Sequence, residues 1–186
     1  FQLCFQRSLE TSNMLLDDLF KHVADKVEGL YSHWFLRELG SNWSDVCADE
    51  LAQYGKVMEI PQQENFYRSR IKNAASRMFV IISDAMRYEV AATLAEELQR
   101  ENQSQVKLDN VQGVFPSITK FGMAALLPHS KLSAEIKGDI LTMLADGLST
   151  ASANRDKVLK AANHASVAWQ YKNIIGMKRA ERSALV

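Results

Sequence analysis

The feature that most constrains the fold is the apolar run MFVIIS, residues 78–83, which ends directly before Asp84. The run is short and rich in β-branched residues, which is typical of a strand covered on both faces. A helical pattern follows over residues 87–102, and residues 105–115 then read as a second extended segment. Strand, helix and strand of these lengths predict a βαβ unit with a parallel sheet.

The chain before this unit has a helical pattern. From residue 15 onward, apolar residues recur at spacings of three and four, which predicts a long helix. Thr11, Ser12 or Asn13 would cap its start, Gly29 would interrupt it, and Gly40 would end it. A second helix is expected over residues 61–77, because proline suits the first turn of a helix. Its buried side would consist of Phe66, Tyr67 and Ile71.

The chain after residue 130 is less clear in its pattern. Residues 134–147 predict a hairpin that turns at Lys137, Gly138 and Asp139, although their apolar spacing also fits a helix. The tail over residues 154–186 reads as helical, with a break near Asn163 and His164 and a capping residue at Asn154.

Composition excludes several classes of protein. The chain has 22 basic and 22 acidic residues, and it is 47% hydrophobic and 24% charged, as an ordinary soluble globular domain is. Neutral charge removes the simplest argument for nucleic-acid binding, yet it leaves a local basic groove open. No apolar run reaches the roughly 18 residues that a membrane span needs, and the start has no signal-peptide pattern.

The two cysteines, Cys4 and Cys47, have no metal-ligand spacing. Since disulfides persist mainly in oxidising compartments, we expect two reduced thiols in a cytoplasmic protein. The sequence also lacks an initiator methionine, and we expect it to be part of a longer protein.

Candidate site residues follow the two expected strands. Ligands bind outside the carboxyl ends of the strands in an open parallel sheet, and Asp84 occupies that position after the first strand. After the second strand, Pro116 marks a turn, and the hydroxyls of Ser117 and Thr119 stand where a helix begins. If the two strands are neighbours, Asp84 and Thr119 converge on one edge of the sheet.

The chemistry of such a pair has two interpretations. A carboxylate suits a divalent cation, and a threonine hydroxyl becomes a good nucleophile when a metal or base lowers its pKa. The alternative is that Asp84 caps the helix over residues 87–102, and that Ser117 or Thr119 caps the helix after Pro116. Arg87 could face an anion or pair with Glu89. The four histidines form no ligand pair, and no P-loop or GxSxG motif is present.

Two motifs carry a family resemblance. VIISDAMRYEVAATL and GVFPSITKFGMAALLPH closely resemble the start of the PglZ domain, in particular that of the type A PglZ proteins of BREX phage-defence systems. The pieces LYSHWFLRELGSNW, LADGLSTASANRDKVLKAA and WQYKNIIGMKRAE extend the similarity over nearly the whole chain. By this resemblance, residues 1–76 form a helical region, and residues 77–186 form the N-terminal part of an α/β, alkaline-phosphatase-like domain.

The resemblance implies a metal-dependent phosphatase or phosphodiesterase. Asp84 would be a ligand of one of two zinc ions, and Thr119 would be the metal-bound nucleophile, with Ser117 as the alternative. The remaining Asp and His ligands of the superfamily have no counterpart after Thr119. A zinc site needs about three or four protein ligands, so we expect this stretch alone to be inactive and to bind no zinc tightly.

The resemblance also implies partners. Other BREX components, among them the DNA methyltransferase, would bind the complete protein, and nucleic acid remains open as a partner. A non-catalytic scaffold that docks these components is the alternative function.

Overall fold

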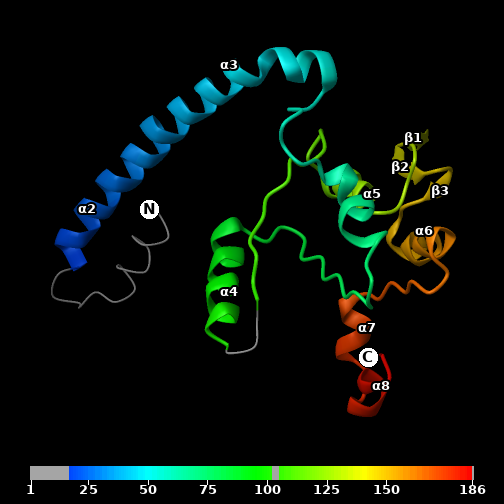
Figure 1. Cartoon of the computed structure of the whole chain (residues 1–186). Helices are drawn as coiled ribbons and strands as arrows, with labels where there is room; N and C mark the ends of the chain where they lie inside the picture. The colour runs from blue at the N-terminus through cyan, green and yellow to red at the C-terminus, as the bar shows by residue number, and fades with distance from the viewer. Residues whose placement is uncertain (1–16, 102–104, 186) are drawn as a thin grey trace. The chain divides into compact units, whose positions relative to one another are not determined.

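The structure is a computed structural model that describes residues 17–101 and 105–185 (Figure 1). The chain divides into two compact units. The first unit comprises the described residues up to Met58 together with Ala85–Asp109, and the second comprises Glu59–Asp84 and Asn110–Val186. The expected caps at Thr11, Ser12 and Asn13, and Cys4, lie outside the described residues. The division expected at residues 76 and 77 stays a prediction.

A continuous helical segment dominates the first unit. Helix α2 (Asp17–Gly29) passes into a π-helical turn, η2 (Leu30–Phe35), and then into α3 (Leu36–Tyr54). The backbone hydrogen bonding changes from the α-helical to the π-helical pattern after Gly29, where the sequence suggests an interruption. The predicted end at Gly40 is wrong, because an interior glycine costs a helix only about 1 kcal/mol relative to alanine. The helix ends instead at Gly55, whose φ of +68° is the left-handed conformation that glycine adopts easily.

Helix α4 (Tyr88–Arg100) also belongs to the first unit, and it confirms the helix expected after the apolar run. Its preceding residue, Arg87, is extended and makes no side-chain capping bond.

The parallel βαβ unit is wrong within the described residues. Residues 77–83 are extended but form no strand, and residues 105–115 contain only one isolated parallel bridge, between Gln62 and Gln112. A strand requires a neighbour for its backbone groups, and apolar character alone does not provide one. Ile81 is 93% exposed, so no described segment covers the run that the sequence predicts to be buried.

The helix expected over residues 61–77 is also shorter than predicted. A 3-10 turn, η3 (Gln63–Asn65), leads into a π-helical turn, η4 (Tyr67–Ile71), and no helix continues to residue 77. Phe66, Tyr67 and Ile71 are half-buried, in agreement with their expected role.

The sheet of the second unit is small and antiparallel. Strands β1 (Leu132–Lys137), β2 (Ile140–Ala145) and β3 (Leu148–Ser149) lie in the order β1-β2-β3. Lys137 pairs with Ile140 across a turn in which Gly138 has a φ of +59°. The predicted hairpin is therefore confirmed, and the helical alternative is wrong. In the coarse sense the chain is α/β, since helices accompany a sheet.

Three short helices follow the sheet: α6 (Arg155–Ala162), α7 (Tyr171–Ile175) and α8 (Arg179–Ser183). The helix break expected near Asn163 is confirmed, since α6 ends there in an extended residue. Asn154 precedes α6 but makes no side-chain capping bond. The buried residues Leu127, Ala145 and Val158 form a core between β2 and α6. No helix in the described part of the chain is long and apolar enough to cross a membrane.

Candidate functional site

The two principal site candidates lie together in the second unit. The Thr119 hydroxyl donates a hydrogen bond to Asp84, with 3.3 Å between Oγ1 and Oδ2. Thr119 is the first residue of helix α5 (Thr119–Ala125), and Asp84 follows the extended run over residues 77–83. Chain segments 35 residues apart therefore bring a carboxylate and a hydroxyl into direct contact.

Backbone contacts fix the segment that carries Thr119. The Ile118 amide donates to the Pro116 carbonyl over 2.8 Å, and the Phe115–Pro116 peptide bond is cis. The Gln63 side chain accepts from the Val114 amide and donates to the Gly122 carbonyl. Because these contacts hold both sides of the turn, the position of the Thr119 hydroxyl is set by the unit's own packing.

The capping alternative is wrong for these residues. The residue that precedes α4 is Arg87, and the residue that precedes α5 is Ile118, and neither helix has a side-chain cap. Thr119 directs its hydroxyl to Asp84 instead of to the backbone of its own helix. Within the described chain Ser117 makes no side-chain hydrogen bond, which leaves Thr119 as the hydroxyl that meets the carboxylate.

Arg155 is a charged residue that interacts electrostatically with Asp84, which the sequence did not reveal. Its Nε donates to the Thr150 carbonyl over 3.2 Å, at the start of α6. Burial lowers the pKa of Arg155, and the negative charge of Asp84 opposes that change. Arg155 belongs to the motif LADGLSTASANRDKVLKAA, but in the sequence its neighbour Asn154 attracted attention as a cap.

Arg87 pairs with Glu89, which is the second of the two roles expected for it. Its guanidinium lies 3.6 Å from the Glu89 carboxylate, and its side chain is 80% exposed. No anion-binding role is needed to explain it.

The donor set does not by itself fit zinc. Asp84 and Thr119 offer two neighbouring oxygen-bearing groups, whereas zinc binds about four ligands. Among the residues that the structure describes, no group of three or more His, Cys, Asp or Glu side chains is close enough to hold a metal ion. Cys47 is buried within α3, and the His129 ring bonds the Leu127 carbonyl.

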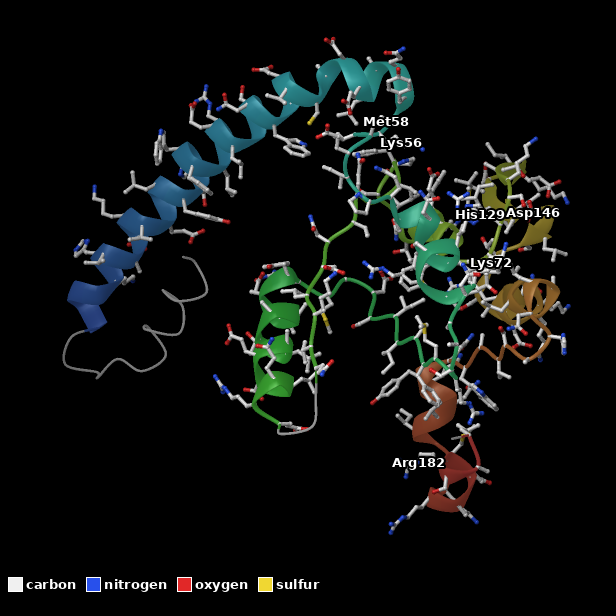
Figure 2. The ribbon with its side chains drawn as sticks, viewed as in Figure 1. Lys56, Met58, Lys72, His129, Asp146 and Arg182 are labelled. Atoms are coloured by element: carbon white, nitrogen blue, oxygen red, sulfur yellow. The ribbon has the colours of Figure 1, made fainter. Side chains whose placement is uncertain are left out.

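A cavity of about 970 Å³ in the same unit lies apart from the pair. Lys72, His129 and Asp146 are among its lining residues (Figure 2). The Asp146 carboxylate accepts hydrogen bonds from the Ser130 and Lys131 amides, which hold its pKa below the ordinary value of 3.8. The Asp146 carboxylate thus links the turn after β2 to the loop at Ser130 and Lys131. Neither Asp84 nor Thr119 lines the cavity.

Comparison with known proteins identifies relatives of most of the chain. The family model for the BREX system PglZ alkaline phosphatase-like domain matches residues 64–186. The chain is 40% identical over 176 residues to the alkaline phosphatase-like protein BrxZ of Escherichia coli O9:H4 (strain HS), a match covering 90% of this chain and 20% of that protein. It is 35% identical over 165 residues to the alkaline phosphatase-like protein PglZ of Bacillus cereus (strain H3081.97), covering 87% and 19%.

The chain thus spans about a fifth of the length of the curated relatives it matches. No solved structure matches it.

Proposed function

The chain belongs to the PglZ family of BREX alkaline phosphatase-like domains, and on that premise we propose that it supplies the nucleophile of a phosphoryl-transfer site. Thr119 is the nucleophile, and Asp84 is the carboxylate that orients it. The reaction is hydrolysis of a phosphomonoester or phosphodiester by the complete protein.

The observation that carries this proposal is the hydrogen bond between Thr119 Oγ1 and Asp84 Oδ2. A threonine hydroxyl is a weak nucleophile unless a neighbouring group activates it. By accepting the hydroxyl proton in a hydrogen bond, the carboxylate directs a lone pair of Oγ1 away from itself, toward an approaching phosphorus. Attack forms a bond between Oγ1 and phosphorus and breaks the bond from phosphorus to the leaving oxygen, while the Thr119 hydroxyl proton passes to the Asp84 carboxylate and from there to the leaving alcohol. Water then cleaves the threonine phosphoester.

Arg155 supports the same assignment through charge. A phosphoryl group that approaches Thr119 would meet the negative charge of Asp84, which repels it. The Arg155 guanidinium interacts electrostatically with Asp84 and offsets part of this repulsion.

Zinc enters the proposal only for the complete protein. Two zinc ions there would supply Lewis-acid charge, and Asp84 and Thr119 would be among their ligands. The described residues offer too few donors for such a site, so further ligands would have to come from other parts of a longer protein. On its own, the present stretch is then inactive.

The test uses the complete protein and a chromogenic phosphodiester. Thr119→Val removes the hydroxyl but keeps the shape of the side chain, and turnover should fall by at least about 10³-fold. Thr119→Ser, which keeps a hydroxyl, should retain measurable turnover, and Ser117→Ala should leave it nearly unchanged. If Thr119→Val retains full turnover while Ser117→Ala abolishes it, the nucleophile is Ser117 and the assignment is wrong.

A scaffold that docks other BREX components, including the DNA methyltransferase, is the second candidate function. The incomplete donor set favours it, because docking needs no metal. Pull-down of these components by the complete protein should then be equal for the wild type and for Thr119→Val with Asp84→Asn. Loss of both docking and turnover in this variant would contradict an independent scaffold role.

A further inference from the structure

One glutamine side chain links the two sides of the segment that carries Thr119. Oε1 of Gln63 accepts a hydrogen bond from the Val114 amide over 3.2 Å, and its Nε2 donates to the Gly122 carbonyl over 3.3 Å. Val114 precedes Thr119 by five residues, and Gly122 follows it by three. Because a primary amide can accept and donate at the same time, Gln63 ties the chain before the turn to the helix after it.

The backbone of Gln63 is held in place as well. Its amide donates to the Gln112 carbonyl over 2.9 Å, and the Gln112 amide donates to the Pro61 carbonyl over 2.8 Å. These two bonds form the parallel bridge between Gln62 and Gln112. The Gln63 side chain, which is half-buried, therefore reaches the turn from a fixed backbone.

Two glycines allow this close approach. Gly122 is the fourth residue of α5, a position at which glycine favours a helix less than alanine does. A Cβ on Gly122 would lie 3.3 Å from Nε2 of Gln63, and a Cβ on Gly113 would lie 3.6 Å from Oε1. At 3.3 Å the Gln63 amide would have to move by a few tenths of an ångström. The glycine within α5 thus leaves the space that the Gln63 amide occupies.

The hydrogen bond between Thr119 and Asp84 depends on such support. Its oxygens are 3.3 Å apart and exposed, whereas hydroxyl donors usually lie about 2.7–2.8 Å from an oxygen acceptor. A bond of this length restrains the two segments only weakly. The backbone around Thr119 therefore has to set the distance.

We propose that Gln63 is a positioning residue for the nucleophile Thr119. By bridging both sides of the turn, it fixes the start of α5 and with it the distance from the Thr119 hydroxyl to the Asp84 carboxylate. This inference rests on the function proposed for Thr119. The matched family domain begins at residue 64, so Gln63 lies just outside it, yet the compact unit that contains α5 also includes Glu59–Asp84. Residues in front of the matched domain thus help to build the site.

The test compares variants of the complete protein, with kcat and KM measured on a chromogenic phosphodiester. Gln63→Met keeps the length of the side chain and removes both hydrogen bonds. We expect kcat to fall about 10- to 100-fold, because displacing a reacting group by about 1 Å can cost roughly 100-fold in rate. KM should change less than about twofold, since Gln63 acts on the nucleophile and not on the bound substrate.

Gln62→Met is the matched control. Gln62 is also half-buried, and its Nε2 donates to the Ile60 carbonyl and to Oε1 of Gln112 instead of to the turn. Both variants should lower the melting temperature, but Gln62→Met should leave kcat within about threefold of the wild type. In the chain as it stands, hydrogen exchange of the Val114 amide should be faster in Gln63→Met and unchanged in Gln62→Met.

Gly122→Ala separates positioning from stability. Alanine strengthens a helix, so this variant should melt no earlier than the wild type, yet the added Cβ crowds Nε2 of Gln63. We expect kcat to fall about three- to tenfold. In the Gln63→Met background, the same substitution should change kcat less than about twofold, because the contact is already lost.

Four results would overturn the inference. Full kcat in Gln63→Met, while Thr119→Val abolishes turnover, would remove the positioning role and leave the proposed function intact. Equal losses of kcat in Gln63→Met and Gln62→Met would show a general loss of packing. A raised KM with unchanged kcat would place Gln63 among the groups that bind substrate. Full turnover in Thr119→Val would reject the proposed function and this inference with it.

Discussion

At the scale of single residues, sequence position and side-chain chemistry led to Asp84 and Thr119, and the structure places the two in hydrogen-bond contact. Their types could be read from the sequence because a carboxylate and a hydroxyl each follow an expected strand. Arg155 could not be found in this way. An arginine at the start of a helix is common on protein surfaces, and only the folded chain brings its charge near Asp84.

The negative charge of Asp146 should stabilise the fold, and the substitution Asp146→Asn tests this. Its φ of +47° is a conformation that asparagine also tolerates, so Asp146→Asn removes the charge without straining the backbone. The pKa of Asp146 is lowered, first by the Ser130 and Lys131 amides, so its carboxylate stabilises the fold above pH 3.8. That stability is lost as the pH falls from 3.8 through the folded-state pKa.

Thermal unfolding followed by circular dichroism checks this prediction. Asp146→Asn should melt below the wild type at pH 7, and the gap should narrow as the pH is lowered past 3.8. A constant gap over the whole pH range would show that the charge is not what holds the two loops.

At the scale of elements, local patterns predicted α4 and offered the β1–β2 hairpin beside a helical alternative. The β1–β2 hairpin joins strands through a two-residue turn, and α4 forms its hydrogen bonds within itself. The apolar run over residues 77–83 is different, since a strand in a parallel sheet depends on partners distant in the sequence. The described residues provide no such partner, and the run stays extended and exposed.

Substitutions of Gly138 test the turn of the β1–β2 hairpin. Its φ of +59° is left-handed, and no atom lies within 4 Å of the position that a Cβ would occupy. Gly138→Ala should therefore destabilise the hairpin by about 1–2 kcal/mol through backbone strain alone. Gly138→Asn should cost less, because asparagine visits this conformation more readily.

Hydrogen exchange of the β1 and β2 amides is the measurement for both variants. Faster exchange in Gly138→Ala than in Gly138→Asn supports the strained turn. Equal exchange rates would mean that the turn adopts another conformation in solution.

At the scale of the whole molecule, membership of an alkaline phosphatase-like family contrasts with the small number of possible metal ligands that the described residues bring together. Residues 64–186 match an alkaline phosphatase-like domain, while the described residues bring together one carboxylate and one hydroxyl. The chain covers about a fifth of its relatives' length. The two-zinc centre proposed for the complete protein would therefore require more donors than the described residues assemble.

Calorimetric titration with zinc checks this expectation on the chain as it stands. We expect no stoichiometric site of micromolar or tighter affinity, because two donors cannot replace the water shell of the ion. The Asp84→Asn variant should give the same titration curve as the wild type. A stoichiometric heat that Asp84→Asn abolishes would show that this stretch alone assembles a zinc site.

The sequence by itself determined the family, the helices α4 and α6 and the types of residue at the candidate site, and it offered the hairpin beside a helical alternative. These features depend on side-chain chemistry and on contacts between residues close in the chain. Only the tertiary structure decided that Thr119 meets Asp84 instead of capping α5, that Arg155 interacts electrostatically with Asp84, and that residues 77–83 form no strand. The physical reason is that each depends on which distant segment lies alongside, and residue order does not state that directly.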